Sequence, residues 1–301
     1  MHIVAALMLF AHAVTVSIAG ASRGRGVRGA RVRATLETMS FPVRIGVQLQ
    51  PQHAPDYGLI RDAVLRAEDL GVDVLFNWDH FYPLYGDPEG AHYECWTMLG
   101  AWAEQTERVE FGPLVTCNSY RNPELLADMA RTVDHISGGR LIFGIGSGWF
   151  ERDYTEYGYE FGTKGSRLDE LATSLPRITD RLGKLNPAPL RDIPLMIGGS
   201  GPRKTLPLVA QYANIWHAFL GVDSYREKSA LLAEYCAEVG RDPAEIERSA
   251  EVRYEGDKAA TLAYTDDITA EGVSLLTVAT SGPDYDLSAA ELLCDWRDAN
   301  S

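Results

Sequence analysis

Asp79 and His80 form the clearest acid–base pair of the chain, and they follow an apolar run that we expect to be a β-strand. Histidine is the side chain best suited to take up and release a proton near neutral pH. An adjacent carboxylate can tune it, although neighbours along a chain point in different directions. The alternative is a structural pair, with a capping aspartate and a buried histidine. We predict that His80 is the catalytic proton carrier.

A glycine-rich segment, Gly198-Gly199-Ser200-Gly201-Pro202, runs directly into a helix that we expect to start near Arg203. Backbone N–H groups at a helix start, with glycines that admit an oxyanion, make a phosphate site. Arg203 and Lys204 add positive charge. A Walker loop needs glycine directly before its lysine, and Arg203 stands there, so a nucleoside triphosphatase is excluded. A plain flexible connection is the alternative to a phosphate site.

The segment Leu141–Asp153, which reads LIFGIGSGWFERD, joins an apolar run to glycines at 144, 146 and 148 and to two aromatic residues. Glycines at the end of a strand let the backbone approach another group closely. Such strand exits are also ordinary tight turns, so the motif alone is weak. Tryptophans follow three of the expected strands, and we predict that they form the wall of a flat ligand site: Trp78, Trp149 and Trp216.

Other chemistries fit the sequence poorly. The histidines at 53, 80, 92, 135 and 217 lack the His-x-His spacing of metallohydrolase barrels, so we predict no metal site. A serine hydrolase is unsupported because the chain has no Gly-x-Ser-x-Gly elbow. The four cysteines lie far apart and form no Cys-x-x-Cys pair, which argues against disulfides and a thiolate zinc site. This cysteine usage predicts a reducing, cytoplasmic location.

Strand-like and helix-like patterns alternate from Val43 onward. Near-continuous apolar runs are typical of parallel strands, and eight of them, each followed by a helix, predict an α/β fold of the (β/α)8 TIM-barrel type. In such a barrel the chemistry gathers at the C-terminal ends of the strands, where the motifs above fall. The expected strands are 43–49, 72–76, 109–116, 140–145, 193–197, 214–218, 246–252 and 273–278, and the expected helices include 57–70, 96–107, 123–136, 167–182, 203–212 and 224–239.

The chain has 301 residues and a net charge of −14. An acidic protein repels phosphate backbones and anionic lipid, so we expect no nucleic-acid or membrane partner. Residues 1–38 hold an apolar run, His2–Ala19, whose positive charge follows it, whereas in a secretory signal the charge comes first. We predict that residues 1–38 are an N-terminal extension outside the fold and that residues 39–301 form one barrel domain. A membrane anchor is the alternative for the extension.

Several motifs, in the correct order, resemble the bacterial luciferase-like monooxygenase superfamily, and within it the branch of oxidoreductases that use the deazaflavin F420. The resemblance extends from about Arg44 to Arg297. Its carriers are Asn77-Trp78-Asp79-His80-Phe81, residues 119–123, 132–140, 144–149 and 197–201, and the ending 281–287.

The resemblance implies a TIM barrel with the cofactor ring near the strand ends. It places a β-bulge, often with a non-proline cis peptide, at Leu114-Val115 against the ring. It also implies that Gly198 to Gly201 cradle the phosphate and that His80 is the active-site histidine. The positions that match cofactor contacts of the family are Asp79, Leu114, Val115, Thr116, Ser147, Gly148, Gly198, Gly199, Ser200 and Gly201.

One departure from the family is informative. Its sugar-phosphate dehydrogenases carry a catalytic glutamate directly after the fourth-strand glycines, where this chain has Trp149. Tryptophan cannot donate the proton that a glutamate would. The resemblance therefore predicts an F420-dependent oxidoreductase that acts as a reductase on a small unsaturated or carbonyl substrate. An FMN-dependent monooxygenase and a non-catalytic flavin- or deazaflavin-binding protein are the alternatives.

The sequence does not name the substrate. We expect residues 81–93 and 150–164 to be lid loops that set specificity. The family often forms homodimers through barrel helices, and helices 96–107 and 123–136 are the faces that would serve here. Packing of the same helices onto the strands is the default.

Overall fold

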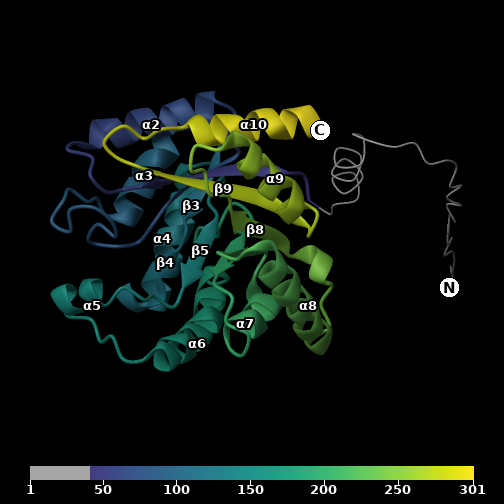
Figure 1. The fold of residues 1–301 in the computed structure, drawn as a ribbon. Coiled ribbons are helices and arrows are strands. Elements are labelled where there is room, and N and C mark those ends of the chain that lie inside the picture. Colours follow the sequence, from purple (N-terminus) through teal and green to yellow (C-terminus); the bar gives the residue numbers. More distant parts are fainter. Residues whose placement is uncertain (1–40) are drawn as a thin grey trace, which may run out of the picture.

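A single sheet of parallel strands forms the centre of the computed structural model, which describes residues 41–301 (Figure 1). Neighbouring strands follow the order β3-β2-β1-β9-β8-β7-β6-β5-β4. The sheet closes into a barrel because Phe111 of β3 donates to the Arg140 carbonyl and accepts from the Ile142 amide, in the segment that leads into β5. The strands are β1 (Arg44–Gln50), β2 (Val74–Asn77), β3 (Glu110–Pro113), β4 (Thr116–Cys117), β5 (Phe143–Gly146), β6 (Leu195–Gly198), β7 (Ile215–Ala218), β8 (Glu247–Glu251) and β9 (Val273–Ser281).

The predicted (β/α)8 barrel is confirmed, and the third expected strand is divided into β3 and β4. The division falls at the peptide bond between Leu114 and Val115, which is cis, where the family resemblance placed it. Two hydrogen bonds, one from β1 and one from β2, hold this segment. The Gln48 side chain donates to the Leu114 carbonyl at 2.8 Å, and the Leu114 amide donates to the Asn77 carbonyl at 2.7 Å.

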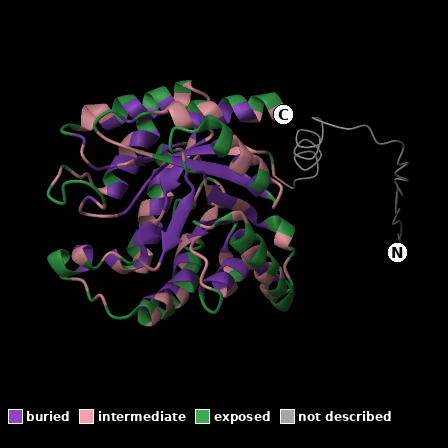
Figure 2. Ribbon diagram, in the orientation of Figure 1, coloured by how far each residue is buried: buried purple, intermediate pink, exposed green. Residues whose placement is uncertain are grey.

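The helices surround the barrel and turn their buried faces toward the strands (Figure 2). Asn122 caps α4 and Pro123 opens it, as the sequence predicts. The helix after the glycine-rich segment begins at Thr205 rather than near Arg203. The helices are α2 (Tyr57–Asp69), α3 (Cys95–Gln105), α4 (Pro123–Ile136), α5 (Glu151–Tyr157), α6 (Lys164–Leu182), α7 (Thr205–Tyr212), α8 (Val222–Val239), α9 (Lys258–Thr269) and α10 (Ser288–Asn300).

The expected lid loop 150–164 differs from the prediction because it contains α5. Asp153 and Tyr154 lie on the buried side of this short helix, and Gly158 ends it with a φ of 73° in the left-handed region. Burial of one face therefore fixes a turn of helix in a segment too polar to show a clear helical pattern.

The predicted boundary at residues 38 and 39 and the apolar run at 2–19 lie outside the described residues. Within residues 41–301, none of the helices is both long and apolar enough to cross a membrane. All four cysteines are buried free thiols.

Candidate active site

A cavity of about 1040 Å³ opens at the C-terminal ends of the barrel strands. Residues from every part of the strand rim line it, as expected for a TIM barrel. Of the predicted site residues, the cavity brings together Trp78, Asp79, His80, Leu114, Val115, Thr116, Ser147, Gly148, Trp149, Gly198 and Gly199. Ser200, Gly201 and Trp216 are not part of its lining.

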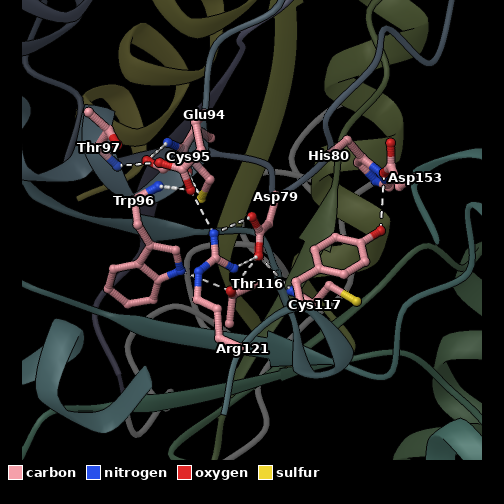
Figure 3. Close-up of polar contacts among 12 residues, drawn as sticks. Asp79, His80, Glu94, Cys95, Trp96, Thr97, Thr116, Cys117, Arg121 and Asp153 are labelled. Carbon is pink, nitrogen blue, oxygen red and sulfur yellow. Dashed lines mark hydrogen bonds and ion pairs between the residues drawn. The ribbon is translucent and has the colours of Figure 1, made fainter. Parts of the chain in front are cut away.

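His80 is oriented by Asp153 of α5 (Figure 3). Its Nδ1 atom lies 2.7 Å from Asp153 Oδ2. The buried Asp153 carboxylate also accepts bonds from the Phe81 amide and from the Tyr120 hydroxyl, both at 3.1 Å. Because a carboxylate only accepts, Nδ1 carries the donated hydrogen. The other ring nitrogen, Nε2, is therefore the atom available to exchange a proton in the cavity.

Aromatic rings enclose the imidazole of His80. The ring centroids of Trp78, Trp149 and Phe150 each lie 5.6 Å from that of His80, in edge-to-face geometry. Trp78 is buried and donates from Nε1 to His92 Nε2 at 2.9 Å, whereas Trp149 is 61% exposed. Burial lowers the pKa of His92 to about 4, so His92 is a neutral acceptor for this bond. Trp78 is thus a fixed wall, and Trp149 stands at the open side.

Asp79 holds together the ends of β2 and β4 (Figure 3). Its Oδ2 atom accepts the Thr116 hydroxyl at 2.6 Å, the Cys117 amide at 3.0 Å and Arg121 Nη1 at 2.6 Å, while Oδ1 accepts Arg121 Nη2 at 3.1 Å. Burial alone would lower the pKa of Arg121, but the Asp79 carboxylate outweighs it and raises the pKa above its ordinary value. The carboxylate that orients His80 is therefore Asp153, and the neighbouring Asp79 positions the strand exit that carries Thr116.

The glycines at the end of the fourth strand leave space for neighbouring parts of the protein. A Cβ at position 144 would lie 2.0 Å from the Pro113 carbonyl oxygen, and one at position 146 would lie 2.7 Å from a Val115 methyl group. A Cβ at Gly148, whose φ is 74°, would lie 2.0 Å from the Tyr154 hydroxyl. The expectation that these glycines serve close approach is met, but the approaching groups belong to the Leu114-Val115 bulge and to α5.

The backbone of the glycine-rich segment is already engaged by β7. The Gly199 amide donates to the His217 carbonyl at 2.9 Å, and the Gly199 carbonyl accepts Trp216 Nε1 at 2.8 Å. Lys204 pairs with Asp169 at 2.5 Å. The cations that line the cavity are Lys164 and Arg167 of α6 and Arg253, which follows β8. Of the four residues expected to cradle a phosphate, Gly198 and Gly199 line the cavity, and Ser200 and Gly201 do not.

The prediction that Trp216 walls the ligand site is wrong. Trp216 is fully buried outside the barrel lumen and packs on Tyr225 of α8, with ring centroids 4.9 Å apart. Side chains alternate along a strand, so its neighbour His217 faces inward and lines the cavity instead. No cluster of three or more metal-ligating side chains occurs within residues 41–301.

The model of the luciferase-like monooxygenase family matches residues 38–259. The chain belongs to this enzyme family. Among its relatives, a Mycobacterium tuberculosis protein whose name assigns it provisionally to the coenzyme F420-dependent oxidoreductases is 31% identical over 204 residues, which is 59% of this chain and 56% of the relative. The F420-dependent glucose-6-phosphate dehydrogenase of Amycolatopsis mediterranei is 27% identical over 72% of this chain and 70% of its own length.

Solved structures confirm the luciferase-like fold. The coenzyme F420-dependent tetrahydromethanopterin reductase of Methanopyrus kandleri superposes with a TM-score of 0.67 at 18% identity, covering 83% of this chain and 97% of the reductase. At 18% identity, this structural similarity establishes the barrel fold only. The chemistry has to be argued from the residues of the site.

Sequence reasoning missed several residues of this luciferase-like site. Asp153 was visible as an acid beyond the fourth-strand glycines, but its link to His80 requires a bond between two strand exits. Arg121 lies inside the 119–123 motif without an assigned role. From the sequence, its neighbour Tyr120 was expected only to widen the aromatic wall, whereas its hydroxyl donates to Asp153. The sequence did contain one signal. Because Asp79 and His80 are adjacent, their side chains point in different directions, so the carboxylate that orients His80 has to come from another segment.

Proposed function

We propose that this luciferase-like protein is an F420-dependent oxidoreductase that transfers hydride between the deazaflavin and a small organic substrate. The observation that carries the proposal is the Asp153-oriented His80 at the wall of a large cavity whose floor is the Leu114-Val115 bulge. The similarity to proteins named as F420-dependent enzymes supports the deazaflavin over other cofactors.

The cavity residues fit such a cofactor. Leu114 and Val115 offer an apolar floor for a flat ring, and a Cβ at position 198 would come 3.2 Å from Val115, so glycine keeps the edge of this floor open. Lys164 and Arg167 supply positive charge for a phosphate at the α6 side. We assign ring contacts to Leu114, Val115, Ser147 and Gly148, and phosphate contacts to Gly198, Gly199 and Lys164. When bound, F420 supplies a hydride donor or acceptor.

The chain itself supplies orientation, a dry site and a proton. Asp153 fixes the His80 ring through Nδ1, so Nε2 gives a proton to a substrate oxygen in the direction of reduction and takes one in the direction of oxidation. Trp78 and Trp149 shield His80 from bulk water on two sides. Asp79 acts indirectly, because it holds the β4 residue Thr116 in place.

Reduction is favoured over sugar-phosphate dehydrogenation because Trp149 stands where the dehydrogenases of the family carry their catalytic glutamate. The indole of Trp149 packs edge-to-face on His80 and has no titratable group. His80 is then the proton carrier that contacts Trp149, and it can supply the one proton that a carbonyl or activated alkene needs.

The test is to titrate the full-length protein with F420 and, separately, with FMN while following tryptophan fluorescence. We expect quenching by F420 at low micromolar concentration and much weaker quenching by FMN. Trp149→Phe should remove most of the quenching, and Trp216→Phe, which alters a tryptophan outside the cavity, should retain it. Preference for FMN together with substrate-dependent oxygen consumption would make the protein a monooxygenase. Tight binding without hydride transfer, unaffected by His80→Ala, would make it a flavin or deazaflavin carrier.

A further inference from the structure

The cavity wall at the ends of β7 and β8 holds two polar groups that the hydride-transfer proposal does not use. They are His217 of β7 and Glu251, the last residue of β8, and both line the cavity. His217 pairs in register with Ser249, two residues before Glu251 on the same side of β8. The two groups therefore stand one above the other on a single wall.

His217 presents a buried nitrogen that lacks a partner. The ring is fully buried, and Nδ1 lies 2.8 Å from Ser249 Oγ. Within the part of the chain that the structure describes, Nε2 has no hydrogen-bond partner. Burial lowers the pKa of His217 to about 3, so the ring is neutral near neutral pH. A buried polar atom without a partner is costly, and in a cavity wall this indicates a ligand group that completes the bond.

Glu251 places a carboxylate on the same wall. Its Oε2 atom accepts Arg253 Nε at 3.0 Å, but the Arg253 side chain is 76% exposed, against 19% for Glu251. An ion pair with so exposed a partner is held weakly. The carboxylate therefore remains available to a cation inside the cavity.

Charge is divided across the cavity. Glu255 and Asp286 line the same end as Glu251, and Arg253 is the basic residue among them. Lys164 and Arg167 lie on the α6 side. An anionic ligand group is therefore drawn to α6 and repelled at β8, whereas a cationic group is drawn to β8.

We propose that His217 and Glu251 form a substrate subsite that binds a protonated amine and rejects carboxylate and phosphate groups. With Nδ1–H donating to Ser249, His217 Nε2 accepts one ammonium hydrogen and the Glu251 carboxylate accepts another. An ammonium group offers three donors, so it satisfies both acceptors at once. This subsite rests on the proposed function in one respect: the bulge and the α6 side are then occupied by F420, which leaves this wall to the substrate.

The test measures binding of three probes with one carbon skeleton: cyclohexylmethylamine, cyclohexylmethanol and cyclohexanecarboxylate. Each is titrated calorimetrically into the full-length protein, once free and once saturated with F420. We expect the amine to bind about tenfold or more tightly than the carboxylate, with the alcohol between them. Glu251→Gln should abolish that preference, and Arg253→Ala should increase it.

Two further variants separate the subsite from general effects. His217→Asn keeps an amide near Ser249 Oγ but has no group at the position of Nε2. It should therefore weaken binding of the amine probe about fivefold and leave binding of the carboxylate probe unchanged. Glu238→Gln removes one exposed negative charge near the C-terminal end of α8, and it should change nothing because Glu238 does not line the cavity. Circular dichroism of each variant shows whether it has folded.

The proposal is overturned if the carboxylate binds as tightly as the amine, if Glu251→Gln keeps the preference, or if none of the probes binds. Failure of the hydride-transfer proposal looks different. If F420 does not bind while the free protein shows the expected order of probes, the subsite stands and the cofactor assignment falls. If F420 binds but the probes do not show the expected order of affinity, the cofactor assignment stands and the subsite falls.

Discussion

Replacement of Asp79 by asparagine tests whether this carboxylate supports the site or contacts the cofactor. Asp79 is 1% exposed and accepts four bonds, from Thr116, Cys117 and both terminal nitrogens of Arg121. Asparagine keeps a single acceptor oxygen. Even if that oxygen takes the three bonds of Oδ2, the side-chain NH₂ faces Arg121 Nη2, and the buried guanidinium loses one of its two charged partners.

The expected loss of stability follows from these contacts. Removing one partner of a buried ion pair costs about 3–5 kcal/mol. Arg121 retains Glu94, whose carboxylate lies 2.6 Å from Nη2, so we expect the lower end, about 3 kcal/mol. Glu94 is the matched control because it binds the same guanidinium but is 40% exposed. Glu94→Gln should cost about 1 kcal/mol or less.

The assay is urea unfolding followed by tryptophan fluorescence, with F420 titration of each folded variant. Asp79→Asn should lower the free energy of unfolding about threefold more than Glu94→Gln. It should also weaken binding of F420, because Thr116 and Cys117 are no longer held in place. Weaker F420 binding at unchanged stability would show a direct cofactor contact instead. Equal effects of the two variants would refute the assignment of a buried, structural ion pair.

Three further predictions follow from the same geometry. Asp153→Asn should lower kcat about 10–100-fold with little change in F420 affinity, because His80 loses its orienting carboxylate; a fall in affinity alone would contradict this. Gly146→Ala should cost about 1–3 kcal/mol through contact with Val115, whereas Gly100→Ala, which meets open space within α3, should stabilise by about 0.5–1 kcal/mol in urea unfolding. The folded-state pKa of His217 is lowered to about 3, so the unfolded chain binds the extra proton as pH falls from about 6.5, and stability should decline by up to about 1.4 kcal/mol per pH unit on its account. His217→Gln should remove that share of the slope between pH 6.5 and 4, and an unchanged slope would show that His217 does not titrate on unfolding.

The strands were predictable because both faces of a parallel barrel strand are covered, which leaves runs of apolar residues that are hard to mistake. The division of the third strand was not visible in those runs. Leu114 and Val115 are as apolar as their neighbours, and only the resemblance to a family with a bulge there placed the break correctly. The helical content of residues 150–164 was missed for the opposite reason, since α5 has few apolar residues and is fixed by the burial of Asp153 and Tyr154.

The direction of single side chains was the weakest part of the sequence argument. At β7 the tryptophan was the more conspicuous residue, yet Trp216 faces α8 and His217 faces the cavity. At β2, Asp79 and His80 were treated as one acid–base unit, and they serve different partners, Arg121 and Asp153. A shift of one residue exchanges the two faces of a strand, so composition alone cannot decide which neighbour reaches the site.

The glycine motif and the bulge are parts of one feature. Gly144, Gly146 and Gly198 surround the bulge: a Cβ on Gly144 would meet Pro113, and one on either of the others would meet Val115. The ring floor that the cofactor is proposed to contact is therefore set by residues on two neighbouring strands that need not touch the cofactor. A motif can mark the correct site while its residues act on the protein instead of the ligand. Stability and F420 binding therefore have to be measured together, as for Asp79→Asn: loss of both identifies a residue that supports the site, and loss of binding alone identifies a residue that contacts the cofactor.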